Sequence, residues 1–294
     1  MSRKALLIIN RHARRGEANA LKAIECLTKL GLDFTEASVE SSHDVSDVIR
    51  QYRDQVEQVI LGGGDGTMNA AIEGLLETRL PLGVLPMGTA NDLARSLKIP
   101  LTLPEACDVI ANGTLEQVDL GWVNGRYFFN TGSLGLTVQI RRKLSKEMKH
   151  RWGILAYAIT ALQVLWNNPP FAAELCVDGG EIKQMKSVLI VVGNGRYWGG
   201  RLTIAKDATI NDQCLDVCSL NIRHWWQIFL ALPALYSGDY ASHSLIQGFR
   251  CQEVEIRTEP PYDINTDGES TTSTPAHYRI IPQAVSVLVP DNSR

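Results

Sequence analysis

The sequence predicts an α/β domain followed by a mostly β domain. The N-terminal part is expected to form a doubly wound, Rossmann-like parallel sheet, because short apolar runs alternate with stretches of helical periodicity. The C-terminal part is expected to form an antiparallel β-sandwich-like domain, because its apolar runs flank tight-turn sequences. We place the first domain at residues 1–122, joined by the C-terminal tail from about 283 to 294, and the second at 123–282.

The first third of the chain supplies the alternating pattern. Strands are predicted at Ala5–Ile9, Phe34–Val39, Val59–Leu61 and Gly83–Leu85. The first of these is apolar at every position, as expected for a strand covered on both faces. Apolar residues at helical spacing predict helices that include residues 20–27, 45–52, 68–76 and 91–97. Such βαβα order indicates a parallel sheet with helices on both faces.

Beyond about residue 116, hairpin signals replace this alternation. Asn124-Gly125 and Asp178-Gly179-Gly180 each lie between two apolar runs. The run after Asp178-Gly179-Gly180 extends from Ile182 to Val192. Further strands are expected at 215–220, 254–257 and 285–289, and two uncharged helical stretches at Trp152–Trp166 and Trp225–Tyr236. Neither stretch reaches the ~20 apolar residues that a membrane-spanning helix needs.

Composition excludes several classes of protein. The chain is 45% hydrophobic and 21% charged, as is ordinary for a globular enzyme, and its net charge of −3 gives no reason to expect a nucleic-acid partner. Six cysteines are scattered without a C-x-x-C pair, so we expect free thiols. The apolar run Ala5–Ile9 is too short for a secretory signal, and we expect a cytoplasmic protein.

A glycine loop, Gly62-Gly63-Gly64-Asp65-Gly66-Thr67, stands between a predicted strand and a predicted helix. Glycines let backbone N–H groups approach an anion, and the helix start adds its dipole, so the loop is typical of a phosphate site. It is neither a Walker A loop nor the dinucleotide-binding G-x-G-x-x-G. Asp65 would suit a position beside Mg²⁺ or a hydrogen-bond donor. The alternative is a tight turn with no ligand.

A second loop, Pro86–Asp92, also lies between a strand and a helix. Because adjacent parallel strands end at the same carboxyl edge, both loops should meet where doubly wound folds bind ligands. For Asn91 and Asp92 alone, the alternative is capping of the following helix.

Five segments together resemble the diacylglycerol kinase catalytic family, in its bacterial, YegS-like lipid-kinase branch. They are GGGDGTMN (62–69), LPMGTANDLAR (85–95), VVGNGRYWGGRLTIAKDATINDQCLDV (191–217), NTDGE (265–269) and RIIPQAVSVLVP (279–290). The GGDGT motif alone is shared with NAD kinases and phosphofructokinases, but the combination in this order is specific. The resemblance covers nearly the whole chain.

The resemblance implies an ATP- and Mg²⁺-dependent kinase that phosphorylates the hydroxyl of a diacylglycerol-like lipid. The nucleotide would contact Asn10, Ser38, Gly63, Gly64, Asp65, Gly66, Thr67, Met68, Asn69, Ala70, Thr89 and Asn91. A structural Mg²⁺ would be bound by the side chain of Asp212 and the carbonyls of Thr209 and Cys214. Glu269 would be the general base, with the carboxylate of Asp267 in the same turn; the alternative for this turn is a solvated β-turn.

The chain departs from the family pattern at three places. Gln213 stands where relatives usually carry glycine, and Ala70 where glutamate is common. The first would alter the turn at the metal site, and both leave room for a weakened nucleotide or metal site. The segment after the first strand is unusually basic, with Arg11, Arg14 and Arg15.

The acceptor and the partners are less constrained. A basic segment with Arg141, Arg142, Lys143, Lys146, Lys149 and Arg151 precedes the apolar stretch that begins at Trp152. Such a segment favours peripheral contact with a membrane, and the alternative is a solvated helix face with the apolar stretch in the core. Three functions remain: a lipid kinase, a kinase of a soluble substrate such as NAD, and a non-catalytic nucleotide-binding regulator. A homodimer is left open.

Overall fold

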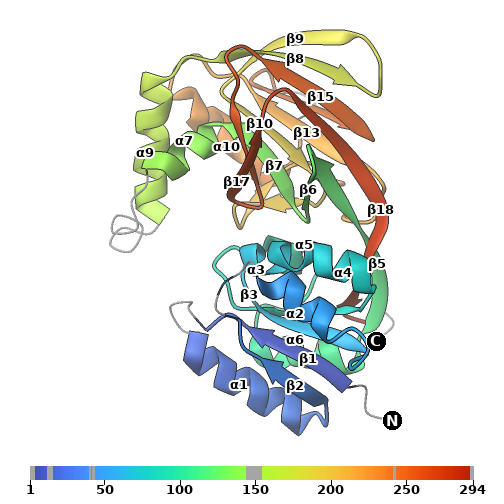
Figure 1. Ribbon diagram of the computed structural model, residues 1–294. Coiled ribbons are helices and arrows are strands. Elements are labelled where there is room, and N and C mark those ends of the chain that lie inside the picture. The colour runs from blue at the N-terminus through green and yellow to red at the C-terminus, as the bar shows by residue number, and fades with distance from the viewer. Residues whose placement is uncertain are drawn as a thin grey trace.

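The computed structural model describes residues 4–11, 16–39, 41, 44–143, 154–240 and 243–291. Two domains follow one another, with the N-terminal third of the chain below and the β-rich part above in Figure 1. Of the basic residues noted in the sequence, Arg14, Arg15, Lys146, Lys149 and Arg151 lie outside the described residues, as does Trp152. Within the described part, the helices are too short or too polar to cross a bilayer.

The N-terminal domain has the predicted parallel sheet. Its strands are β1 (Lys4–Ile9), β2 (Asp33–Ala37), β3 (Gln58–Gly63) and β4 (Leu82–Pro86). They lie in the order β2-β1-β3-β4, with every pairing parallel. Because β1, β3 and β4 are buried almost throughout, their runs are apolar rather than alternating.

Helices cover both faces of this sheet (Figure 1). They are α1 (Gly16–Lys29), α2 (Val45–Gln51), α3 (Asp65–Ala70), α4 (Ile72–Thr78), α5 (Asp92–Ser96) and α6 (Leu103–Asn112). Helix α1 packs with α6, and α2 packs with α4. The predicted helix over 68–76 is two helices, which meet at Ala71.

The C-terminal domain is the predicted antiparallel sandwich. A six-stranded sheet has the order β14-β13-β10-β7-β16-β17. Its strands are β7 (Thr131–Gly135), β10 (Leu189–Gly193), β13 (Leu215–Leu220), β14 (Ile246–Cys251), β16 (Asp263–Thr266) and β17 (Glu269–Ser273). One face packs on a second sheet that includes β8 (Phe171–Val177), β9 (Ile182–Ser187) and β15 (Glu253–Thr258). The other face is covered by α7 (Leu136–Lys143), α9 (Ile154–Asn167) and α10 (Gln227–Ser237).

Both predicted hairpins are present. Strand β5 (Thr114–Val123) turns at Asn124-Gly125 into β6 (Arg126–Phe128), and β8 turns at Asp178-Gly179 into β9. The apolar run from Ile182 to Val192 forms two strands. They are separated at Val188, where the buried hydroxyl of Ser187 bonds the backbone of Leu189, and β9 and β10 belong to different sheets. A short hairpin, β11 (Tyr197–Trp198) with β12 (Leu202–Thr203), completes the domain.

Two long strands connect the domains. Strand β18 (Ala276–Val289) pairs with β15 at one end and with β4 at the other, while β5 runs antiparallel beside it. The chain bends at Gln283, which has a φ of +49° and whose N–H donates to buried Asp119. A sheet that continues through both domains therefore sets how the two sides of the cleft face each other.

Candidate active site

The two glycine loops meet at the carboxyl edge of the parallel sheet. A Cβ placed on Gly88 would lie 2.5 Å from the Cα of Gly64, so the two loops touch through their backbones. The N–H of Met87 donates to the carbonyl of Gly63 at 2.9 Å. A Cβ on Gly63 would collide with Thr67, whose side chain folds back over the strand end. Glycine is therefore required here for close backbone approach.

Asn10 and Ser38 end the neighbouring strands at the same edge. The N–H of Asn10 donates to the carbonyl of Gly62 at 2.8 Å, and its amide nitrogen lies 3.4 Å from the hydroxyl of Thr67. Ser38 follows β2 and is exposed. Parallel pairing of β2, β1 and β3 thus brings these two residues and the glycine loop together.

Not every predicted nucleotide contact points outward. The side chain of Met68 is 2% exposed and belongs to the hydrophobic core, so only its backbone is available to a ligand. The amide of Asn91 closes its own loop, accepting from the N–H of Gly88 at 2.8 Å and donating to the carbonyl of Gly88 at 3.1 Å. Asn91 begins α5 with a φ of +52° and makes no side-chain capping bond. Thr89, at the tip of this loop, is exposed.

Asp65 and Asp92 form a pair of carboxylates where the loops meet. The N–H of Leu93 donates to Asp65 at 3.2 Å, and the N–H of Gly200 donates to Asp92 at 2.8 Å across the cleft. Burial and, next, the negative charge of Asp65 raise the pKa of Asp92 to about 6, against backbone hydrogen bonds that lower it. The sequence prediction did not include Asp92, although the segment LPMGTANDLAR that contains it was available as the signal.

The turn with Asp267 and Glu269 stands at the start of β17 in the other domain, close enough to this pair for the charge of Asp65 to act on Asp267. Asp267 and Gly268 have φ values of +44° and +88°, the conformation that Asp-Gly adopts in a two-residue hairpin turn. The carboxylate of Asp267 accepts the N–H groups of Phe129, Asn130 and Thr131 at 2.8–3.0 Å. These three contacts fix the position of the turn.

Glu269, by contrast, is exposed to the cleft. Its Oε1 lies 3.8 Å from the point where a Cβ on Gly66 would stand, so it approaches the glycine loop closely. Burial raises the pKa of Asp267 to about 7, and the charge of Asp65 acts in the same direction while the backbone N–H groups oppose it. The two domains thus place carboxylates on both sides of one cleft.

At the predicted magnesium site, Asp212 already has partners. Its carboxylate accepts the N–H groups of Thr209 at 2.9 Å and Cys214 at 3.1 Å, and it forms an ion pair with Arg250. Arg250 also lies 4.0 Å from Asp216. Among the described residues, no three His, Cys, Asp or Glu side chains are grouped to bind a metal. Asp212 is the only carboxylate of the predicted set, and Arg250 already balances its charge. The site therefore suits a divalent cation poorly, and the magnesium assignment stays a prediction.

Gln213 adopts the geometry that glycine would provide. Its φ is +59°, and its N–H donates to buried Asp119 at 2.7 Å. The same carboxylate accepts the N–H of Gln283, so Asp119 stabilises two left-handed residues at the domain junction. The departure from glycine therefore leaves the turn in the left-handed conformation.

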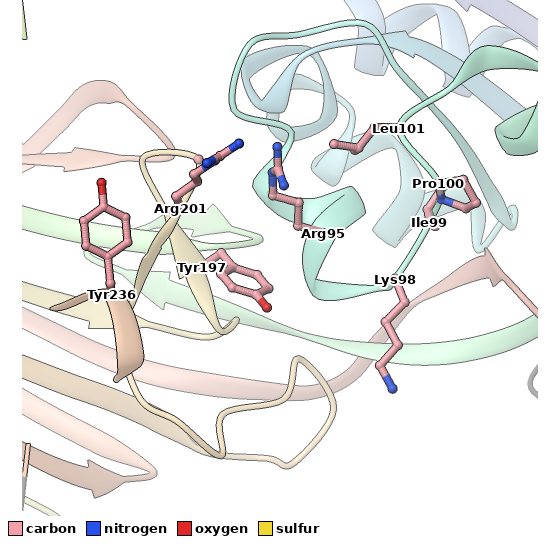
Figure 2. A pocket seen from close by; sticks show the side chains of 9 residues that line it. Arg95, Lys98, Ile99, Pro100, Leu101, Tyr197, Arg201 and Tyr236 are labelled. Carbon is pink, nitrogen blue, oxygen red and sulfur yellow. The ribbon is translucent and has the colours of Figure 1, made fainter. Parts of the chain in front are cut away.

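A pocket of about 550 Å³ opens beside the contact between Asp92 and Gly200. Three cations line it: Arg95 and Lys98 from the first domain and Arg201 from the second. Figure 2 shows the guanidinium groups of Arg95 and Arg201 turned toward each other, with Tyr197 and Tyr236 on the side of the second domain. None of the nine lining residues, all within the described part, is acidic. The three cations were not predicted as site residues.

Comparison with known proteins assigns both domains. Residues 4–123 match the model of the diacylglycerol kinase catalytic domain, and residues 132–289 match the YegS C-terminal NAD kinase beta sandwich-like domain. A probable lipid kinase of the YegS-like type from Chromohalobacter salexigens is 31% identical over 81% of this chain and 78% of its own. The chain belongs to the diacylglycerol kinase family, in its YegS-like branch.

Other relatives agree with this assignment. The diacylglycerol kinase of Bacillus subtilis is 28% identical over 80% of this chain and 78% of its own. The crystal structure of a diacylglycerol kinase from Bacillus anthracis aligns with a TM-score of 0.77 at 22% identity, covering 99% of this chain and 98% of that chain. At this identity the likeness concerns the fold alone, and it agrees with the predicted fold class, a parallel α/β sheet followed by an antiparallel β-sandwich.

Proposed function

We propose that this YegS-like protein is a lipid kinase that transfers the γ-phosphoryl group of MgATP to the hydroxyl of a diacylglycerol-like glycerolipid. The observation that carries the proposal is the position of Glu269, whose carboxylate approaches Gly66 of the glycine loop from the opposite domain. A donor site and a carboxylate that accepts a proton are both needed for phosphoryl transfer to an alcohol. The glycine loop would be the donor site on one side of the cleft, and Glu269 would be the carboxylate on the other.

On the donor side, the loops at Gly62–Thr67 and Pro86–Asn91 would bind the nucleotide phosphates through backbone N–H groups. The start of α3 leaves such groups without partners inside the helix. The Mg²⁺ that accompanies ATP would neutralise phosphate charge, and Asp65 would be the carboxylate that faces it. Asp92 lies close enough to Asp65 for that charge to add to the effect of burial on its pKa, and two neighbouring carboxylates favour a bound cation.

On the acceptor side, Glu269 would take the proton of the attacking hydroxyl. The hydroxyl oxygen forms a bond to the γ-phosphorus while the bond to the bridging oxygen of ADP breaks, and the proton passes to the Glu269 carboxylate. Asp267 has a positioning part, since its three backbone contacts fix the turn that carries Glu269. No step depends on the predicted metal site at Asp212.

The acceptor class rests on relatives. The Bacillus subtilis relative is named a diacylglycerol kinase, and the Chromohalobacter salexigens relative a lipid kinase. Because diacylglycerol resides in membranes, we propose that the protein acts at a membrane surface from the cytoplasm. Six free cysteines support a reducing compartment.

The test is phosphoryl transfer from labelled ATP in mixed micelles, with diacylglycerol and NAD offered in parallel. We expect labelled lipid, dependence on Mg²⁺, and no labelled NADP. Transfer to NAD without transfer to lipid would refute the lipid assignment. ATP binding without transfer to either acceptor would indicate a nucleotide-binding regulator.

A further inference from the structure

Helix α10 presents an apolar stripe to solvent. Its inward residues Ala231, Ala234 and Leu235 are buried against the six-stranded sheet. Its outward positions are Trp226 at its start and then Phe229, Leu230, Pro233 and Tyr236, all exposed. A surface helix ordinarily carries polar residues on its outer face, so this helix is apolar on both faces.

The end of α9 extends the stripe. Trp166 is 71% exposed, and its ring lies 6.1 Å from that of Trp225, which in turn contacts Phe229 edge-on. Neither α9 nor α10 contains a charged residue. We call the exposed set Trp166, Trp226, Phe229, Leu230, Pro233 and Tyr236 the α9–α10 face.

One end of this face reaches the cleft. Tyr236 also lines the pocket that contains Arg95, Lys98 and Arg201 (Figure 2). On the other side, α7 packs against α9 and carries Arg141, whose guanidinium lies beside the turn before Glu269. An object seated on the α9–α10 face would therefore meet cations at its border and the acceptor side of the cleft.

We propose that the α9–α10 face docks on an anionic phospholipid bilayer, with Tyr236 and the pocket cations at the level of the headgroups. This inference rests on the proposed function, because an enzyme that acts on diacylglycerol must meet its substrate at a bilayer surface. Tryptophan and tyrosine favour the membrane interface, and an apolar helix face bordered by cations is typical of peripheral binding. Arg95, Lys98 and Arg201 supply the charge complementary to phosphate.

The experiment measures flotation of the full-length protein with phosphatidylcholine vesicles, with and without phosphatidylglycerol. The test variant is Phe229→Ser with Leu230→Ser. The matched control is Leu21→Ser with Leu115→Ser, two exposed leucines of the other domain, 60% and 51% exposed. We expect vesicle partitioning of the test variant to fall by about tenfold or more and that of the control to be unchanged. Partitioning of wild type should rise with phosphatidylglycerol, and Arg201→Ser should abolish that rise.

Kinase assays separate this inference from the proposed function. The test variant should lose activity on vesicles but keep it on a monomeric short-chain diacylglycerol. Wild-type protein that binds vesicles but phosphorylates no lipid would refute the function and leave the docking face standing. Vesicle binding of the test variant equal to that of wild type would overturn the docking face. The docking face would also be overturned if light scattering showed that wild type is a dimer, that the variant disrupts this dimer, and that vesicle binding persists in the variant.

A second measurement needs no destabilising change. Brominated lipids quench tryptophan fluorescence on contact, so wild type should be quenched, and Trp166→Phe with Trp226→Phe should lose most of that quenching. Quenching that survives this double substitution would place another surface on the membrane and overturn the assignment.

Discussion

Replacing Asp92 with asparagine should make the protein more stable at neutral pH and less active. Asp92 is 7% exposed, and burial together with the charge of Asp65 raises the pKa of its carboxyl from 3.8 to about 6. Asparagine keeps an oxygen that accepts the N–H of Gly200 but removes the buried negative charge. The substitution therefore removes the unfavourable free energy of keeping a negative charge buried at this position in the native state.

The size of the effect follows from the pKa. At roughly 1.4 kcal/mol for each pKa unit, the difference between 3.8 and about 6 corresponds to about 3 kcal/mol. Below pH 3.8 both states of wild type are protonated and no cost exists. As the pH rises toward 6 the unfolded chain loses its proton first, so native stability falls and stays lower above 6. Allowing for a weaker hydrogen bond from Gly200, we expect a gain of about 1–3 kcal/mol at pH 7.5.

Urea unfolding at pH 4 and pH 7.5 tests this expectation. The difference between Asp92→Asn and wild type should be near zero at pH 4 and favour the variant at pH 7.5. Asp54→Asn is the control, since the Asp54 side chain is 92% exposed and its ion pair with Arg53 lies at the surface, so its replacement should change stability little. A variant less stable than wild type at pH 7.5, or a gain that does not change with pH, would refute the reasoning.

Three further predictions concern other parts of the site. Glu269→Gln should lower kcat by about 10²–10⁴-fold while the ATP dissociation constant is unchanged, and full turnover would remove Glu269 from the role of base. Gly88→Ala should weaken ATP binding, measured by calorimetry, because its Cβ would stand 2.5 Å from the Cα of Gly64; unchanged affinity would argue against the loop contact. Arg250→Met should lower the thermal midpoint, and millimolar Mg²⁺ should restore it, because Asp212 would lack a counter-charge. Equal Mg²⁺ effects on wild type and variant would contradict the view that Arg250 takes the place of a cation.

Local sequence determined much of the fold. The strands before Gly62 and Pro86, the hairpin at Asn124-Gly125 and the Asp267-Gly268 turn all follow from short-range chemistry, since glycine and Asp-Gly permit backbone conformations that other residues resist. The break at Val188 could not be predicted, because the hydroxyl of Ser187, by bonding the backbone of Leu189, interrupts a run that is continuous in β-propensity.

Partners distant in sequence were decided only by the tertiary structure. From the sequence, Asp212 was interpreted as a metal ligand, but β14 places Arg250 in an ion pair with it. Asp92 was compatible with a helix cap, but in the structure it lies near Gly200 and Asp65. From the sequence, the uncharged stretch Trp225–Tyr236 could pack in the protein core or contact a membrane. The structure shows which of its residues are buried and which are exposed. The sequence by itself determined the two loops, the acidic turn and the order of the two domains, because these depend on neighbours along the chain. The charge balance of Asp212, the pKa of Asp92 and the exposure of the Trp225–Tyr236 side chains depend on neighbours in space. Only the tertiary structure, in which β5 and β18 join the two domains, determines them.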